Sequence, residues 1–275
     1  MKIYRINGCF VVEKGSLSYQ FSDPSTWDEI INRDDLHDYL DQLISTEAKG
    51  GNDFHPLAPI GSQEVWAAGV TYFSSRLARM EESKDAGGGD FYSRVYGADR
   101  PEIFFKATAA RTVGPGENFR IRKDSTWDVP EPELTLCVTS SGKIVGYTIG
   151  NDVSSRSIEG ENPLYLPQAK TFDGCACLGP CIYVTKEPLA EDTSISMKIS
   201  RGSEVVFEGE TTLREMKRKP QELVDYLLRE TSFPQGVFLM TGTGIVPSTD
   251  FTLRVGDIVD ISIDSIGTLT NAVGA

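Results

Sequence analysis

Two glutamates at the start of an apolar segment are the residues whose spacing most clearly suggests chemistry. Glu131 and Glu133 lie two positions apart, and Glu133–Val138 has the composition of a β-strand. Because side chains alternate faces along a strand, both carboxylates are expected to point the same way. Pro130 and Pro132 cannot donate backbone hydrogen bonds, so we expect this end of the strand at the rim of a sheet, where a ligand can reach it.

A third carboxylate, Asp152, is expected to face the first two. Residues 139–142 have a turn composition and precede a second strand-like segment over 143–150, which predicts a β-hairpin. With a two-residue loop, this hairpin pairs Glu131 with Asp152. Three carboxylates so close would repel unless one were protonated or a cation lay among them, and such a site favours Mg²⁺, Mn²⁺ or Ca²⁺ over zinc. From geometry alone, a metal site and a solvated acidic strand end both remain open.

The elements that must position these carboxylates are mostly strands. Short β-branched and aromatic runs predict strands over 65–70, 102–106, 133–138, 143–149, 181–185, 194–200, 237–241 and 258–263. Two helices are predicted over 74–83 and 219–229, the second with Pro220 in its first turn. The sequence therefore predicts an α+β, β-rich fold.

The first 60 residues differ from the rest. A strand-like opening over 2–12 precedes helical spacing over 27–43, with start signals at 23–25, and residues 48–61 are rich in Gly and Pro. We expect a small N-terminal subdomain over 1–60 and a larger domain over 61–275. Within the larger domain, Gly87, Gly88 and Gly89 are expected to form a flexible connector.

The composition disfavours several classes of function. Among 275 residues, Asp and Glu outnumber Lys and Arg by 40 to 27, and the net charge of -13 disfavours nucleic acid and anionic membranes as partners. His37 and His55 are the two histidines, which limits imidazole-based triads and zinc sites. Cys175, Cys177 and Cys181 lack Cys-x-x-Cys spacing and are expected to be buried, reduced thiols. No signal-peptide or membrane-span pattern is found, so we expect a cytoplasmic protein.

An ordered set of motifs between about Val65 and Gly256 resembles the fumarylacetoacetate hydrolase superfamily. The motifs are Pro-Glu-Pro-Glu-Leu (130–134), Asn-Asp-Val-Ser-Ser-Arg (151–156), Lys170 with Asp173, Gly179 with Pro180, and Thr-Gly-Thr-Gly (241–244). The resemblance implies a twisted mixed β-sheet roll and a homodimer or homotetramer. It also implies a divalent metal, Mg²⁺ with Mn²⁺ or Ca²⁺ as alternatives, bound by Glu131, Glu133 and Asp152.

One departure from the family pattern bears on the reaction. Hydrolytic members carry Tyr-x-x-His-x-x-Glu, whose His and Glu activate the attacking water. Ser75 and Ala78 stand at those positions here, and neither is a competent general base, so hydrolysis of a carbon–carbon bond is disfavoured.

Several other stretches point to one branch of the family. Residues 69–72, 78–83, 100–106 and 161–170 most resemble the 2-keto-3-deoxy-D-arabinonate dehydratase branch. This likeness implies metal-dependent dehydration of that 2-keto acid, or of its epimer, to 2,5-dioxopentanoate in oxidative pentose degradation.

The resemblance implies that Lys170 and Thr243 line the substrate pocket, and the chemistry of dehydration suggests roles for individual residues. Lys170 is the expected base, with a positively charged clamp on the substrate as its alternative role. Glu102 is expected to protonate the departing hydroxyl, or else to face solvent. Lys106 and Arg156 are expected to bind the acid end of the substrate or neighbouring carboxylates, with ordinary salt bridges as the alternative. The remaining expected substrate contacts are Tyr72, Ser74 and Thr243.

Two other functions remain open at this stage. The same pocket could hydrolyse, decarboxylate or tautomerise another small 2-keto acid, such as an acylpyruvate. The chain could instead be a non-catalytic family member that binds a divalent metal, although Lys170 beside three carboxylates argues against this.

Overall fold

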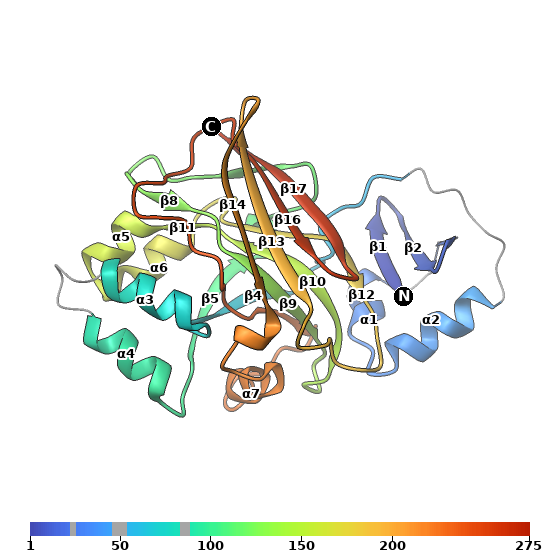
Figure 1. Ribbon diagram of the computed structural model, residues 1–275. Helices are drawn as coiled ribbons and strands as arrows, with labels where there is room; N and C mark the ends of the chain where they lie inside the picture. Colours follow the sequence, from blue (N-terminus) through green and yellow to red (C-terminus); the bar gives the residue numbers. More distant parts are fainter. Residues whose placement is uncertain (23–25, 46–53, 83–88) are drawn as a thin grey trace.

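Two β-sheets form the body of the protein. The computed structural model describes residues 1–22, 26–45, 54–82 and 89–275. The larger sheet has ten strands in the order β3-β2-β1-β12-β10-β9-β15-β4-β5, with β6 paired to β12 (Figure 1). These strands are β1 (Lys2–Ile6), β2 (Cys9–Lys14), β3 (Leu17–Phe21), β4 (Glu64–Gly69), β5 (Glu102–Thr108), β6 (Thr112–Val113), β9 (Pro132–Val138), β10 (Ile144–Asp152), β12 (Ala176–Tyr183) and β15 (Val237–Met240).

The second sheet packs on one face of the first. Its order is β14-β13-β16-β17-β7, and β8 and β11 form a separate pair. These strands are β7 (Asn118–Arg120), β8 (Asp128–Val129), β11 (Ser154–Ser155), β13 (Ser194–Arg201), β14 (Glu204–Thr212), β16 (Ile258–Ile263) and β17 (Gly267–Gly274). The sheets are mixed, and the fold is therefore the β-rich α+β class that the sequence predicts.

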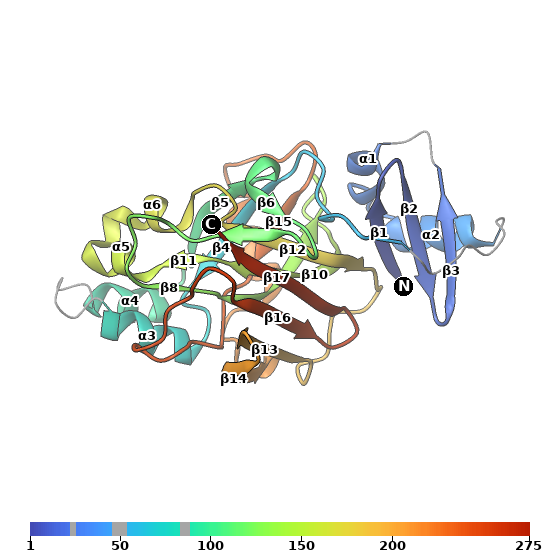
Figure 2. The ribbon, with the colours of Figure 1, turned by 90° about the horizontal axis from the view of Figure 1, so that it is seen from above.

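Except for α7 (Pro220–Leu227), which lies below the middle of the sheets in Figure 1, the helices gather at the two ends of the sheets (Figures 1 and 2). One group lies beside β1–β3 and the other at the opposite end, next to β5, β8 and β11. The helices are α1 (Trp27–Ile31), α2 (Leu36–Ile44), α3 (Phe73–Glu82), α4 (Gly89–Gly97), α5 (Arg156–Glu161), α6 (Leu166–Lys170) and α7 (Pro220–Leu227), with 3-10 turns at 109–111, 163–165 and 213–215.

Two apolar clusters hold these layers together. The first joins the sheets, since Ile195, Met197 and Ile199 alternate inward along β13 and meet Leu134 and Leu136 of β9. The second lies on the other face of the larger sheet, where the leading segment packs through side chains such as Ile30, Leu36 and Leu40 of α1 and α2. Strand β9 is covered on both faces, and all seven of its residues are buried.

Most predicted strands are present with small shifts in their ends. The prediction over 181–185 was misplaced, because β12 covers Ala176–Tyr183. The second sheet was under-predicted, since β14 and β17 were missed. Helices α3 and α7 were predicted, with Pro220 in the first turn of α7 as expected, whereas α4, α5 and α6 were not.

The predicted helix over 27–43 is broken in two. Thr26 caps α1 in a capping box with Glu29, whereas the predicted start signals at 23–25 lie outside the described residues. The Asn32 side chain, just after α1, donates to the carbonyl of Pro234 and accepts from the backbone N–H of Ser140. These contacts with distant segments interrupt a helical pattern that the sequence alone would continue.

The leading segment shares a sheet with the body. Strand β1 pairs antiparallel with β12, so the N-terminal strands extend the larger sheet, and the division at residue 60 stays a prediction. Of the predicted glycine connector, Gly89 begins α4, and the other two glycines lie outside the described residues. No helix in the described part of the chain is long and apolar enough to cross a membrane.

Candidate metal and substrate site

The β9–β10 hairpin brings the three predicted carboxylates together. Thr148 pairs with Thr135 and Asn151 with Pro132, and the backbone N–H of Asp152 donates to the carbonyl of Glu131 at 2.9 Å. The predicted pairing of Glu131 with Asp152 is therefore confirmed.

The predicted two-residue loop of this hairpin was wrong. The N–H of Thr139 donates to the carbonyl of Lys143, which leaves a three-residue loop that ends at Gly142, whose φ is 88°. Val145 is an extra residue between the pairs Ile144–Val138 and Gly146–Cys137, and this bulge restores the predicted register before the site is reached.

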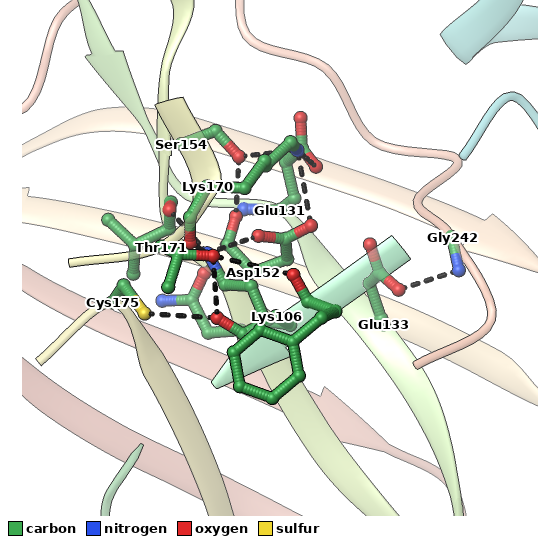
Figure 3. A network of polar contacts seen from close by, with 12 residues as sticks. Lys106, Glu131, Glu133, Asp152, Ser154, Lys170, Thr171, Cys175 and Gly242 are labelled. Atoms are coloured by element: carbon green, nitrogen blue, oxygen red, sulfur yellow. Dashed lines mark hydrogen bonds and ion pairs between the residues drawn. The ribbon is translucent and has the colours of Figure 1, made fainter. Parts of the chain in front are cut away.

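One carboxylate oxygen from each of Glu131, Glu133 and Asp152 lies within 4.8 Å of the other two. Their residues are 5%, 1% and 1% exposed, and Figure 3 shows the three side chains converging. Strand β15 pairs with Thr135–Val138 of β9 and does not extend to the end of β9 at the site. That end is nevertheless buried and does not lie at an open rim. The alternative of a solvated acidic strand end is therefore wrong.

Buried cations match the carboxylates in number. Arg156 donates to Oε1 of Glu131 at 2.6 Å, and the ammonium of Lys170 donates to Oε2 of Glu131 at 2.7 Å and to Oδ2 of Asp152 at 3.1 Å. Lys106 lies 2.6 Å from the other oxygen of Asp152. Each of these cations is 2% exposed or less, so the charges interact with little screening by water.

Glu133 differs from the other two carboxylates. Its Oε2 accepts the backbone N–H of Gly242 at 2.6 Å, the one hydrogen bond described for it. Burial above all, and then the charges of Asp152 and Glu131, raise the pKa of Glu133 well above its usual range. A cation among these carboxylates would offset that penalty.

A small cavity opens directly onto the three carboxylates. It is lined by Ala68, Gly69, Val70, Ser75, Phe104, Glu131, Glu133, Asp152, Arg156, Lys170, Gly242 and Thr243. The predicted residues Lys170, Arg156 and Thr243 thus lie at the site. No histidine is among the lining residues in the described part of the chain, and Ser75 donates its hydroxyl to the carbonyl of Tyr72.

Other predicted residues lie around this cavity. The carboxylate of Glu102 lies against Gly69, and its Oε2 has no hydrogen-bond partner among the described residues. Burial and the charge of Glu133 raise the pKa of Tyr72, whose hydroxyl also has no described partner. Ser74 is exposed and donates to the carbonyl of Gly244, so its predicted contact with substrate stays a prediction.

Three contributors were missed by the sequence analysis. Phe104 lines the cavity and places its ring 5.6 Å from the ammonium of Lys170, whose third contact is the hydroxyl of Ser154 at 2.7 Å. Gly242 supplies the N–H to Glu133. The signal for Gly242 was present, since it lies inside the Thr-Gly-Thr-Gly motif beside Thr243.

The donor set fits a divalent cation. Three carboxylates that converge on one point supply the hard oxygen ligands that Mg²⁺, Mn²⁺ and Ca²⁺ prefer, and no imidazole or thiolate is among them. Glu131, Glu133 and Asp152 are the residues that would hold the ion.

A buried acidic site of this kind, on mixed sheets, defines a class of metal-dependent enzyme. Residues 81–274 match the family model described as the fumarylacetoacetate hydrolase C-terminal domain. The chain belongs to the fumarylacetoacetate hydrolase family.

Two relatives are similar over most of their length. A Haloferax volcanii protein named "Probable 2-keto-3-deoxyxylonate dehydratase" is 53% identical over 223 residues, which are 80% of this chain and 75% of the relative. The 2-dehydro-3-deoxy-D-arabinonate dehydratase of Saccharolobus solfataricus is 47% identical over 226 residues, or 81% and 75% of the two chains.

A solved structure extends the similarity to the whole fold. The 2-keto-3-deoxy-D-arabinonate dehydratase complexed with magnesium and 2,5-dioxopentanoate superposes with a TM-score of 0.83 at 36% identity. The alignment covers 100% of this chain and 99% of that one. The predicted family and fold are thereby confirmed.

Proposed function

We propose that this chain is a hydro-lyase that dehydrates a 2-keto-3-deoxy-pentonate to 2,5-dioxopentanoate with Mg²⁺. The observation that carries the proposal is the convergence of the buried carboxylates of Glu131, Glu133 and Asp152 beside Lys170. The two relatives named for dehydration of such acids, at 53% and 47% identity, support the choice of reaction.

The charge of the site favours an anionic chelating substrate. Three buried carboxylates face three buried cations, Lys106, Arg156 and Lys170, so these six groups carry no net charge when all of them are ionised, as they are when the carboxylates bind a divalent ion. A bound ion adds two positive charges in a region of low dielectric constant. A 2-keto acid, which offers carboxylate and ketone oxygens together, supplies part of the missing negative charge.

The chemistry divides between the ion and the side chains. When bound, the cation acts as a Lewis acid that polarises the 2-keto group of the substrate. When the carboxylates bind a cation, Lys170 would lose its ionic contacts and loss of its ammonium proton to solvent would be favoured, which would leave a neutral amine to take a proton from C3. Glu102, with an oxygen that lacks a described partner, protonates the hydroxyl that leaves C4 as water.

The atoms balance without any further reactant. The C3–H and C4–O bonds break, a C3–C4 double bond forms, and one water is released. The unsaturated keto acid then moves a hydrogen from C5 to C3, which leaves an enol at C4 and C5. Transfer of the enol hydroxyl hydrogen to C4 gives the aldehyde of 2,5-dioxopentanoate. Arg156 and Thr243 line the same cavity and are proposed to contact the substrate, together with Tyr72.

Stereochemistry limits the number of possible substrates. Removal of the stereocentres at C2 and C3 leaves C4 alone, and C4 has the same configuration in D-arabinonate and D-xylonate. Both D-pentonates therefore give one and the same 2-keto-3-deoxy acid, and its epimer is the L form.

Location and assembly belong to the same proposal. Four of the five free cysteines are buried, which fits a reducing compartment such as the cytoplasm.

Large apolar side chains are exposed near the site, with Leu164 83% and Phe73 52% exposed, which fits contact between subunits of a homodimer or homotetramer. Light scattering on the purified protein measures the assembly directly.

Product identification tests the proposed reaction. With Mg²⁺ and the D and L forms of 2-keto-3-deoxy-pentonate, NMR should show 2,5-dioxopentanoate from at least one form. Acylpyruvate cleavage should be at least 100-fold slower, because no histidine base lines the cavity in the described part of the chain. Absence of the aldehyde from both forms, or efficient acylpyruvate cleavage, would contradict the proposal.

A further inference from the structure

Lys106 is a fully buried lysine that does not line the cavity. It lies on β5 at a break in the pairing with β4, where Val65 pairs with Ala107 but Trp66 pairs with Phe105. Lys106 is thus the extra residue of a β-bulge. Such bulges often redirect a side chain next to an active site.

Both the backbone carbonyl and the side-chain ammonium of Lys106 are held by contacts with other segments. Its carbonyl accepts the hydroxyl of Thr171 at 3.2 Å and the thiol of Cys175 at 3.6 Å, as Figure 3 shows. Its ammonium donates to the carbonyls of Val153 and Lys170 and lies 2.6 Å from Oδ1 of Asp152.

These contacts hold the ammonium group away from the cavity. A lysine ammonium has three N–H groups, and here two are directed to carbonyls, whereas Oδ1 of Asp152 contacts the charge as an ion pair without accepting a hydrogen bond. Lys106 is also not among the residues that line the cavity. Of the roles expected from the sequence, these contacts favour binding of a neighbouring carboxylate over binding of the acid end of the substrate.

We propose that Lys106 is a positioning residue that sets the metal ligand Asp152 and the base Lys170 at their working separation. It joins the end of β10, through Asp152 and Val153, to the last residue of α6, Lys170. This inference rests on the proposed metal-dependent function, and it concerns how the site is assembled rather than what it binds.

The test separates positioning from substrate binding. For Lys106→Met, EPR titration of the purified protein with Mn²⁺ should show affinity for the ion lowered 10- to 100-fold, the range typical when a partner of a metal ligand is lost. At saturating Mn²⁺, the KM for the 2-keto acid should stay within threefold of wild type while kcat falls. Unchanged Mn²⁺ affinity with a KM raised tenfold or more would overturn the inference and leave the proposed reaction intact.

Two further variants make the test decisive. Lys198→Met is the matched control, because Lys198 on β13 is half exposed and its contact is an ion pair with Asp260 at 3.6 Å; both its Mn²⁺ affinity and its KM should equal those of wild type. If Lys106→Met does not fold, Lys106→Arg keeps the charge and should bind Mn²⁺ about tenfold less tightly with an unchanged KM. Wild-type Mn²⁺ affinity in a folded arginine variant would contradict the inference.

Discussion

The β9–β10 hairpin meets carboxylates at both of its ends, and the two ends hold them in opposite ways. At the turn, the exposed Asp34 accepts hydrogen bonds from the hydroxyls of Thr139 at 2.6 Å and Ser141 at 2.8 Å. These hydrogen bonds lower the pKa of Asp34. At the site, burial raises the pKa of Glu133.

The difference separates stability from function. The neutral hydroxyls of the buried Thr139 and the exposed Ser141 stabilise the charge of Asp34, so the turn gains stability from its carboxylate. The site buries like charges that destabilise the metal-free fold but converge on one cation position. We therefore expect changes at the turn to alter stability alone, and changes at the site to alter activity most.

The largest effect is expected from Lys170→Met at the site. Loss of the base should lower kcat about 1,000-fold at saturating Mg²⁺, within the range of general acid–base catalysis. Lys143→Met at the turn, which removes the contact with the carbonyl of Asp34, is the matched control and should leave kcat unchanged. Stopped-flow measurement of dehydration checks both, and an active Lys170→Met enzyme would make Lys170 a bystander.

Glu133→Gln should separate activity from stability most sharply. Loss of a metal ligand should lower kcat/KM at least 100-fold. Because the pKa of native Glu133 is raised, its charge destabilises the fold at pH values above that pKa, and this penalty disappears below its unfolded value of about 4.3. Urea unfolding of metal-free protein at pH 8 should therefore give a higher midpoint for the variant, and this gain should shrink at acid pH. A lower midpoint at pH 8 would contradict the account.

Gly242 at the site and Gly142 at the turn both have a positive φ, so alanine substitutions at these two positions compare the backbone of the site with that of the turn. At the site, an added Cβ on Gly242 would lie 2.0 Å from Oγ1 of Thr71, and at the turn one on Gly142 would lie 2.7 Å from the flexible end of Leu228. Gly242→Ala should cost about 3 kcal/mol and most of the activity, whereas Gly142→Ala should cost about 1 kcal/mol and leave activity intact. Urea unfolding measures both losses of unfolding free energy, and equal losses in the two variants would contradict the expected difference between the site and the turn.

The smallest effect is expected from Asp34→Asn. It should cost about 1 kcal/mol at pH 7, because the Asp34 carboxylate and its hydrogen bonds with Ser141 are exposed to water. Since the native pKa of Asp34 is lowered, this stabilisation is present above its unfolded value of about 3.9 and is lost as pH falls through the native value. Urea unfolding of wild type and variant at several pH values measures this stabilisation. Any change in kcat would show that the turn and the site are coupled, which would contradict the account.

The metal ligands could be predicted because they depend on local structure. Glu131, Glu133 and Asp152 lie on one hairpin, whose alternation and pairing follow from short-range rules. The loop itself was predicted wrongly, yet the bulge at Val145 corrected the register within three residues of Gly142. The register predicted at the site was therefore correct, although the loop length from which it was derived was wrong.

The exact contacts of the supporting residues could not be predicted from local patterns, because distant segments place them. Lys106 is more than 40 positions from its partners, and a bulge in β5 directs it to them. The break between α1 and α2 likewise depends on Ser140 and Pro234, which no helical pattern reveals. Ser75, not Ser74, lines the cavity, because the position of each residue around α3 is set by where that helix begins.

The central claim is that one divalent ion, held by Glu131, Glu133 and Asp152, is required for dehydration. Its most direct test measures product formation against the number of Mn²⁺ ions bound per chain, beginning with protein stripped by a chelator. We predict no turnover in the stripped protein and a rise in proportion to occupancy up to one ion per chain. Full turnover in excess chelator would contradict the account.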